Sequence, residues 1–149
     1  MKTLVVGLGN TIRGDDGIGV YVARRLKNKF NSGEVDIMET HYAGIKLMDL
    51  LYDYNKVFII DAVKNGVEAG RVSLFDIEED PNISHKDFHG MNFLDSYIRL
   101  KRTYPRIPED LKVIGISING GDSFEEGLSQ ELKNKLPEIT EKVTGMIRS

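Results

Sequence analysis

The sequence contains no cysteine. That absence excludes disulfides, thiolate nucleophiles, iron–sulfur clusters and every zinc site built on sulfur. Only three histidines are present, so a metal site in this chain must depend mainly on carboxylates. No segment approaches the roughly 18 apolar residues of a membrane-spanning helix. The N-terminal segment also lacks the long apolar stretch of a signal peptide. We therefore expect a cytoplasmic protein with no membrane insertion.

A basic surface is also missing. The chain has 20 Lys and Arg against 23 Asp and Glu, a formal net charge of −3. Proteins that bind nucleic acid through its phosphates need the opposite balance, so we expect no nucleic-acid partner. The 149 residues show no internal repeat, low-complexity segment or linker, which predicts a single domain over residues 1–149.

Short apolar runs and apolar residues at helical spacing predict the secondary structure. The expected strands cover residues 3–6, 35–39, 57–61, 71–76 and 113–118. The expected helices cover residues 18–30, 45–51, 91–101 and 128–147, the last divided at Pro137. This alternation predicts an α/β fold, a three-layer α/β/α sandwich with a five-stranded, twisted, mostly parallel sheet.

The order of the first strands follows from the handedness of crossovers. Right-handed connections place the third strand beside the first, which predicts the order 2-1-3 and a ligand crevice between strands one and three. Only about eight residues separate the third and fourth strands, whereas a parallel crossover needs a dozen or more. We therefore expect the fourth strand to form an antiparallel hairpin with the third.

A glycine-rich loop, GLGNTIRGDDGIG, covers residues 7–19. Its first two glycines suit a tight turn after the first strand. A dinucleotide-binding fingerprint would have a third glycine at position 12, where this chain has Ile12. Asp15 and Asp16 stand where the next helix begins, and two carboxylates there would repel a pyrophosphate. The loop therefore disfavours a nucleotide site.

The two acidic residues have different interpretations. Asp15 suits the N-cap of the following helix. Asp16 gains importance from Asp61, the last residue of the third predicted strand, because the two carboxylates should lie on adjacent strand ends across the crevice. Two carboxylates in such a position repel, share a proton or bind a cation.

A histidine could complete a metal site with these carboxylates. His89 precedes the third predicted helix and is well placed to reach the crevice, while His41 follows the second strand and could also line it. His85 lies in a polar stretch, and we expect it to be exposed to solvent. Two carboxylates and one imidazole suit a divalent ion such as Zn, Mn, Fe or Ni, and the spacing alone does not choose among them.

Three blocks of sequence carry a family resemblance. They are GLGNTIRGDDGIG near the N-terminus, IIDAV near residue 60 and HGMNFLD near residue 90. In this order they resemble the hydrogenase maturation proteases, endopeptidases that process the large subunit of nickel–iron hydrogenases. The similarity spans nearly the whole chain and includes HYAGIKLMDLL, GRVSLFDIEEDP and VIGISI.

The resemblance implies a phosphorylase/hydrolase-like fold and a metal-dependent endopeptidase, of the aspartic or metallo type. Its substrate would be the precursor of a nickel–iron hydrogenase large subunit, from which it removes a C-terminal extension after nickel insertion. The residues implied to contact nickel and to take part in catalysis map onto Asp16, Asp61 and His89, with no nucleophile assigned. Nickel would be supplied by the substrate, with no further cofactor, and we expect other divalent cations to occupy the site in vitro.

Two loops depart from the family pattern. The family often has Asp-Gly-Gly-Thr before the second helix, where this chain has Glu39-Thr40-His41-Tyr42, and Pro-Glu after the last strand, where it has Asn119-Gly120-Gly121-Asp122. Both loops are expected to contact substrate, and the candidate substrate-binding residues are His41, Tyr42 and Gly44. These departures leave open which hydrogenase is processed.

Two other functions stay open from the sequence. One is a nickel-checkpoint module that binds the loaded precursor without cutting it, because the same ligand set serves recognition as well as catalysis. The other is a nucleotide-binding α/β enzyme that uses the turn at Gly7 and Gly9.

Overall fold

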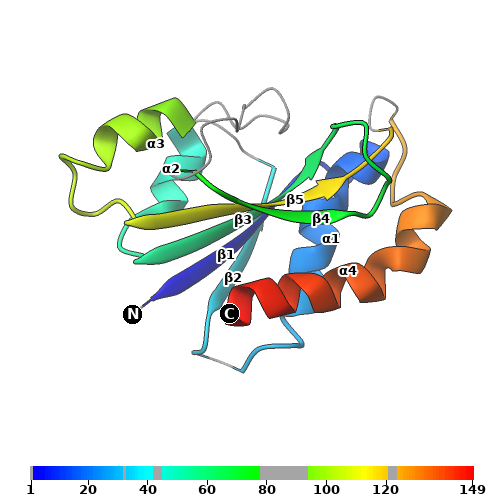
Figure 1. Cartoon of the computed structure of the whole chain (residues 1–149), viewed down its shortest axis with the longest axis horizontal. Helices are drawn as coiled ribbons and strands as arrows, with labels where there is room; N and C mark the ends of the chain where they lie inside the picture. The colour runs from blue at the N-terminus through cyan, green and yellow to red at the C-terminus, as the bar shows by residue number, and fades with distance from the viewer. Residues whose placement is uncertain (1, 32, 42–44, 78–93, 121–123) are drawn as a thin grey trace.

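The computed structural model describes residues 2–31, 33–41, 45–77, 94–120 and 124–149. One five-stranded sheet lies between two layers of helices (Figure 1). The strands are β1 (Thr3–Leu8), β2 (Asp36–Thr40), β3 (Lys56–Val63), β4 (Val72–Asp76) and β5 (Asp110–Ser117). The helices are the 3-10 turn η1 (Gly14–Gly17), α1 (Ile18–Leu26), α2 (Ile45–Leu51), α3 (Leu94–Leu100) and α4 (Gln130–Arg148).

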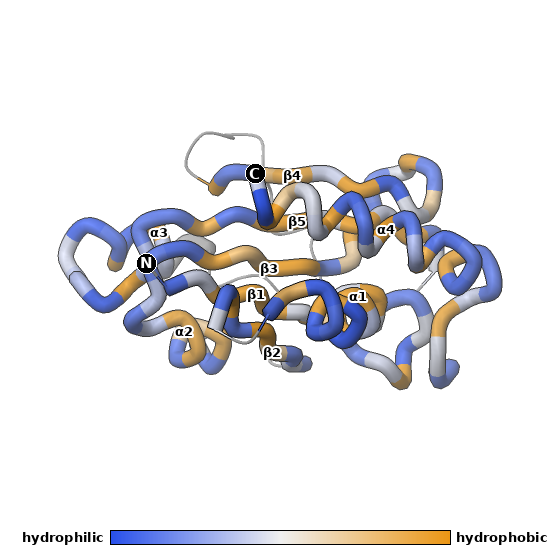
Figure 2. Tube along the Cα trace, turned by 90° about the horizontal axis from the view of Figure 1, so that it is seen from below, coloured by the Kyte–Doolittle hydropathy of each residue, from blue (hydrophilic) through white to orange (hydrophobic). Residues whose placement is uncertain are grey.

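The sheet has a separate apolar core on each face, because successive side chains of a strand point to opposite faces. Leu4 and Val6 of β1 belong to the core under α2 and α3, where Tyr97 is fully buried. Val5 belongs to the core under α1 and α4, with Leu132. Hydrophobic residues accordingly follow the central strands and the inner faces of the helices in Figure 2. The expected α/β sandwich is confirmed.

The strand order is β2-β1-β3-β5-β4. The order of the first three strands confirms the prediction, and β4 is the antiparallel strand. The expected hairpin between β3 and β4 is wrong, because β4 pairs with β5 and β5 takes the place beside β3. Most of β5 is buried whereas β4 is half-buried, so β5 gains more from a central position.

The connection from β3 to β4 crosses the carboxyl end of β5. Gly70 donates its backbone N–H to the carbonyl of Ser117 at 2.8 Å, and Ser117 donates to the carbonyl of Arg71 at 3.0 Å. These bonds explain how eight or so connecting residues suffice to pass an intervening strand, since the chain has only to step across one strand end.

Several boundaries differ from the sequence-based prediction. Strand β3 continues to Val63, so Asp61 lies two residues before its end. Helix α1 ends at Leu26, and Phe30, expected on the same helical stripe, follows the helix and packs partly buried against the core under α1 and α4. Helix α3 is described from Leu94 to Leu100, and the first residues expected in it lie outside the described part of the chain.

Helix α4 runs through Pro137 without a break, which corrects the expected division. A proline in a helix interior costs about 3 kcal/mol relative to alanine. Buried residues lie on both sides of it, Leu132 and Leu136 before and Ile139 and Val143 after, so one continuous apolar stripe offsets that cost.

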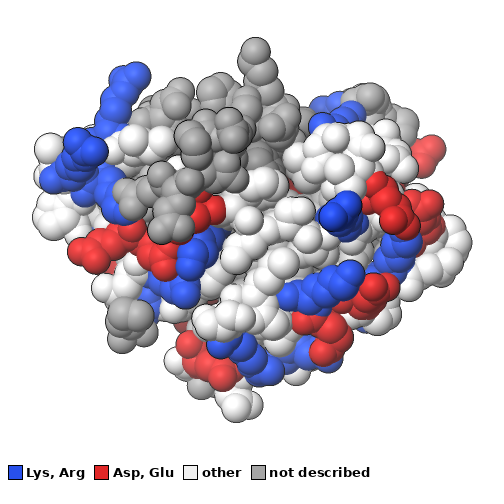
Figure 3. All heavy atoms as spheres, viewed as in Figure 1, with Lys and Arg blue, Asp and Glu red and all other residues white. Residues whose placement is uncertain are grey.

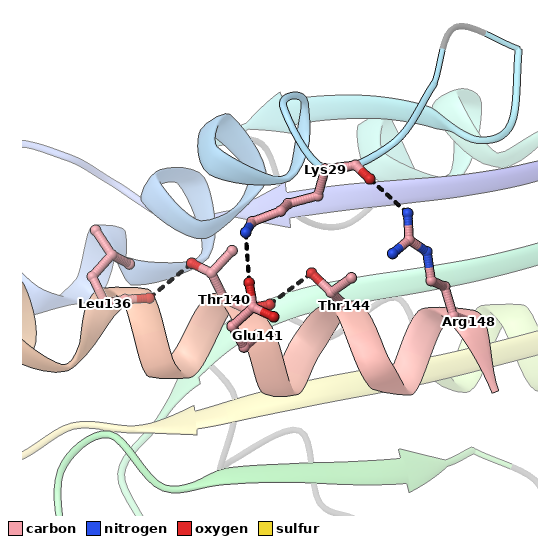
Figure 4. A network of polar contacts seen from close by, with 6 residues as sticks. All are labelled: Lys29, Leu136, Thr140, Glu141, Thr144 and Arg148. Atoms are coloured by element: carbon pink, nitrogen blue, oxygen red, sulfur yellow. Dashed lines mark hydrogen bonds and ion pairs between the residues drawn. The ribbon is translucent and has the colours of Figure 1, made fainter.

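Polar contacts support the same helix (Figure 4). Thr140 donates its hydroxyl hydrogen to the carbonyl of Leu136 at 2.8 Å, and Thr144 donates to that of Thr140 at 2.8 Å. These bonds let two hydroxyl groups be buried. Lys29 pairs with Glu141 at 2.5 Å, and Arg148 donates to the carbonyl of Lys29 at 2.6 Å. The segment after α1 is therefore joined to the C-terminal helix.

Charge is mixed over the surface that Figure 3 shows, where acidic and basic side chains alternate without a continuous patch of one sign. Among the described residues, no helix is long and apolar enough to span a membrane.

Candidate functional site

The glycine-rich loop brings η1 and α1 directly against the carboxyl ends of β1 and β3. A Cβ atom on Gly19 would lie 2.3 Å from the carbonyl oxygen of Ile60 and 2.4 Å from that of Leu8. A Cβ on Gly9 would lie 2.5 Å from the carbonyl oxygen of Asp16. Gly9 and Gly19 do not have positive φ angles, so these glycines are required for close backbone approach rather than for an unusual turn conformation.

This packing buries two carboxylates beside each other. Asp16 of η1 is 3% exposed and Asp61 of β3 is 1% exposed. Asp61 Oδ1 accepts a hydrogen bond from the backbone N–H of Ala62 at 2.8 Å. Its other oxygen, Oδ2, is buried and makes no hydrogen bond with the described residues. The structure thus brings together two of the three residues predicted to contact a metal.

The electrostatics of the pair follow from this burial. Desolvation raises the pKa of the Asp61 carboxyl well above its usual range, the Ala62 amide opposes that shift, and the negative charge of Asp16 adds to it. Two buried carboxylates this close are not both stable as anions unless a proton or a cation compensates them. The pair can therefore hold a proton in the free protein or accept a cation.

Asp15, the neighbour of Asp16, has a structural role. The structure does not place it at the N-cap of η1 or α1, where Arg13 and Gly17 stand without a side-chain cap. Its Oδ1 accepts a hydrogen bond from the backbone N–H of Ser129 at 2.7 Å. Ser129 is the N-cap of α4, so Asp15 anchors the start of another helix. The expected local cap is wrong because Asp15 faces the neighbouring segment.

Residues 20–146 match the family model of the hydrogenase maturation proteases. The chain belongs to the hydrogenase maturation protease family. The match covers well over half of the chain and confirms the family expected from the three sequence blocks. It places the protein among the endopeptidases of hydrogenase maturation, which are hydrolases.

Individual proteins agree with this family assignment. A Methanocaldococcus jannaschii protein with a provisional assignment as a hydrogenase maturation protease is 26% identical over 152 residues, covering 97% of this chain and 96% of that protein. The hydrogenase maturating endopeptidase HybD from Escherichia coli has a TM-score of 0.77 at 20% identity, covering 99% and 93% of the two chains. The solution structure of an endopeptidase from Escherichia coli gives 0.81 at 23%, with the same coverage. These solved structures share the fold.

The remaining predicted residues of this maturation protease divide into two groups. His89, Tyr42 and Gly44 lie outside the described residues, as does His85. His41 is exposed at the end of β2 and lines a pocket of about 360 Å³. The loop after β1, from Gly9 to Ile12, also lines this pocket. The predicted substrate-binding position of His41 is therefore next to the loop that carries Asp16.

Sequence analysis missed an ion pair in the same pocket. Arg24 of α1 donates from Nε to both carboxylate oxygens of Glu39 in β2, at 3.2 and 3.0 Å, and from Nη2 at 3.0 Å. Hydrogen bonding by Arg24 lowers the pKa of Glu39. Arg24 and Glu39 are 15 residues apart in the sequence, so no local pattern joins them. The ion pair forms because α1 packs against β2. A prediction of that packing would have revealed the pair.

Within the described ranges, no group of three or more His, Asp or Glu side chains is arranged to hold a metal ion. Asp16 and Asp61 form a pair, and the third predicted ligand is one of the residues that the structure does not describe. The assignment of all three as a nickel site stays a prediction.

Proposed function

We propose that this maturation protease removes a C-terminal extension from the nickel-loaded precursor of a nickel–iron hydrogenase large subunit, in the cytoplasm, and that it recognises the nickel carried by that precursor. The observation that supports the proposal is the buried pair of Asp16 and Asp61 at the carboxyl ends of β1 and β3. His89 is proposed as the third contact.

The donor set fits a divalent ion that belongs mainly to another protein. Carboxylate oxygens and an imidazole nitrogen bind divalent metals of this class, and without cysteine thiolates the chain is poorly equipped to hold nickel tightly by itself. Asp61 Oδ2 is a buried oxygen without a hydrogen-bond donor among the described residues. Such an oxygen is available to a ligand. Nickel therefore belongs to the substrate in this proposal, and other divalent cations are expected to occupy the site in vitro.

Protonation of Asp61 would link docking to the ion. Oδ1 already accepts the Ala62 amide hydrogen, so the neutral form of Asp61 carries its proton on Oδ2. A cation that binds there releases the proton and compensates both carboxylates. A precursor without nickel brings no cation to the site. Its docking therefore does not relieve the electrostatic cost of burying the two carboxylates beside each other. The arrangement would make metal insertion a condition for cleavage.

The cleavage step would use the metal ion and one of the two aspartates. A bound nickel ion supplies Lewis-acid polarisation of the scissile carbonyl or activation of a water molecule. Asp16 or Asp61 would act as the base for that water. The chain has no cysteine, and no serine stands in a recognisable Ser-His-Asp arrangement, so we propose no covalent acyl-enzyme.

The decisive experiment compares nickel-loaded and nickel-free precursor. Each is incubated with the protein, and the products are weighed by mass spectrometry. We expect loss of a C-terminal peptide from the loaded form alone. Intact mass with a cognate, loaded precursor would overturn the protease function. Binding of the loaded precursor without truncation would instead support the nickel-checkpoint module.

Variants test the site within the same assay. Asp16→Asn, Asp61→Asn and His89→Ala should each abolish truncation. Asp15→Asn is the matched control, because its amide oxygen can still accept from Ser129 and the neighbouring carboxylate is unchanged. Cleavage by Asp16→Asn at the wild-type rate would contradict the site assignment.

The nucleotide-binding alternative is disfavoured by the same loop. Asp16 is buried where a pyrophosphate would approach the start of the helix. Titrations with NAD, FAD and ATP should show no binding.

A further inference from the structure

The loop that carries Asp16 is joined to the segment that leads into α4. The loop covers residues 10–17, and the segment covers residues 124–129. Three hydrogen bonds connect them: Gly14 donates its backbone N–H to the carbonyl of Glu125 at 2.6 Å, Gly127 donates to that of Thr11 at 3.3 Å, and Ser129 donates to the Asp15 carboxylate at 2.7 Å. The last of these bonds ends on the residue next to Asp16, so the segment before α4 holds the loop close to the proposed metal ligand.

The loop has little structure of its own to fix the position of Asp16. Asp16 lies in η1, a 3-10 turn of four residues without a side-chain cap. The hydrogen-bond geometry of a 3-10 turn is poor, so tertiary contacts must fix its position. The backbone is also tightly packed here, since a Cβ on Gly17 would lie 2.9 Å from the α-carbon of Thr11. A movement at Thr11 is therefore passed on to the residues next to Asp16.

The start of α4 is the firmer of the two segments. Ser129 is the N-cap of this 19-residue helix, and its hydroxyl oxygen accepts from the backbone N–H of Leu132 at 3.3 Å. Leu132 is fully buried in the core under α1 and α4. The core therefore fixes α4, and the segment before this helix is the support against which the Asp16 loop is held.

We propose that residues 124–129 act as a brace for Asp16, and that a divalent cation bound by Asp16 and Asp61 locks this brace. Asp16 belongs to the braced loop, whereas Asp61 belongs to the central strand β3. A cation that binds both carboxylates joins the loop to the sheet, so the loop leaves the brace only after the cation dissociates. The inference rests on the proposed function in requiring that the two aspartates bind a cation.

This coupling gives the metal site an effect at the start of α4. Opening of the brace separates the loop from α4 and removes the cation site in one event. A ligand that binds only the closed state lowers the population of the open state by one plus the ratio of its concentration to Kd. Nickel brought by the precursor would accordingly order both the loop and the brace, whereas a nickel-free precursor would leave them able to open.

Amide hydrogen exchange of the metal-free protein, measured by NMR, tests the brace. Asp15→Ala removes the acceptor of the Ser129 N–H, and Asp15→Asn keeps an acceptor oxygen at the same place. We expect the Gly14 and Asp16 amides to exchange about fivefold faster in Asp15→Ala and at nearly the wild-type rate in Asp15→Asn. Wild-type rates in Asp15→Ala, or equal acceleration in both variants, would overturn the brace.

Ser129 tests the same bond from its donor side. Its φ of −59° suits proline, so Ser129→Pro removes the N–H without an unfavourable φ angle. Ser129→Ala is the matched control, because it also loses the capping hydroxyl but keeps the N–H. The Gly14 and Asp16 amides should exchange faster in Ser129→Pro than in Ser129→Ala, and equal rates would contradict a role of the Asp15 bond.

Zinc chloride tests the lock, because Zn²⁺ is diamagnetic and leaves the amide signals observable. Its Kd is first measured by calorimetry. At about ten times Kd, exchange of the Gly14, Gly127 and Ser129 amides should slow about tenfold, whereas the Arg148 amide, which exchanges by fraying at the end of α4, should be unaffected. Asp61→Asn should remove the response. Bound zinc without slower exchange in the brace would overturn the coupling.

The coupling and the proposed function fail in different ways. If neither Zn²⁺ nor Ni²⁺ binds to the wild-type protein, the metal site and the lock are both overturned, and exchange in the metal-free variants still decides the brace. An intact zinc response without cleavage of loaded precursor would instead overturn the protease function and support the coupled site.

Discussion

The α-carbon of Gly19 faces the carbonyl oxygen of Ile60 so closely that a Cβ atom would lie 2.3 Å from it. Ile60 precedes Asp61 in β3, and Gly19 follows η1, which carries Asp16, by two residues. The distance between helix and strand at this point therefore sets the distance between the two carboxylates. Position 19 therefore needs glycine, because a side chain there would push η1 and α1 away from β3.

Substituting Gly19 should accordingly be costly. Gly19→Ala places a methyl group against two backbone carbonyls that are held in the sheet, and overpacking of this kind costs about 1–3 kcal/mol or more. Gly145→Ala is the matched control in α4, where a Cβ meets no atom within 4 Å. It should stabilise by about 1 kcal/mol, because alanine favours helix. Urea denaturation of both variants measures the difference, and equal shifts would contradict the close approach.

Asp61→Asn should stabilise the metal-free protein at neutral pH. The pKa of Asp61 is higher in the folded protein than in the unfolded chain, so folding takes up a proton. Stability therefore falls as the pH rises from the unfolded pKa, about 4, toward the folded one. Asparagine removes this dependence, and we expect a gain on the order of 1–2 kcal/mol at pH 7.

The pH profile of that gain is the check. Denaturation of wild type and Asp61→Asn at pH 4 and pH 7 should give nearly equal stabilities at pH 4 and a more stable variant at pH 7. The variant should be inactive toward the precursor in spite of its stability. A variant less stable than wild type at pH 7 would show that ionised Asp61 is compensated inside the free protein.

Asp15→Ala should separate structure from activity. It removes the acceptor of the Ser129 backbone N–H, and a lost hydrogen bond of this kind costs about 1 kcal/mol. The thermal midpoint should fall by several degrees, roughly 2–8 °C for a domain of this size. Processing measured well below that midpoint should continue, in contrast to Asp16→Asn. A loss of cleavage equal to that of Asp16→Asn would place Asp15 in the site.

Pro137→Ala should stabilise α4. The alanine can donate a backbone hydrogen bond to the carbonyl of Lys133, which proline cannot. The more flexible unfolded chain offsets part of this gain, so we expect a net increase of about 1–2 kcal/mol. Chemical denaturation measures it. An unchanged or lower stability would show that the helix depends on the proline ring for packing.

Local sequence patterns predicted the part of the structure that depends on neighbouring residues. The apolar spacing over residues 45–51 gave helix α2 with its correct bounds. The apolar run before Asp61 and the glycine-rich loop placed two carboxylates at neighbouring strand ends, and the structure brings them together. The order of the first three strands followed from crossover handedness, which is a local property of twisted strands and right-handed helices.

The pairing of β4 and the role of Asp15 depended on tertiary structure. Connection length indicated that β4 is antiparallel, but the choice of β5 as its neighbour depends on which strand gains more from burial. Asp15 has the residue type of a local cap, yet its carboxylate anchors Ser129, 114 residues away along the chain. Helix α4 likewise continues through Pro137 because the apolar stripe on both sides of it packs against the sheet.

The sequence by itself determined the inventory of this protein: no cysteine ligand, one acidic residue in the loop after the first strand and another near the end of the third, and glycines where backbones must meet. Tertiary structure decided that both carboxylates are buried and that this burial raises the pKa of Asp61. Burial and the pKa of a carboxyl group depend on every atom packed around it, and those atoms come from segments far apart in the chain.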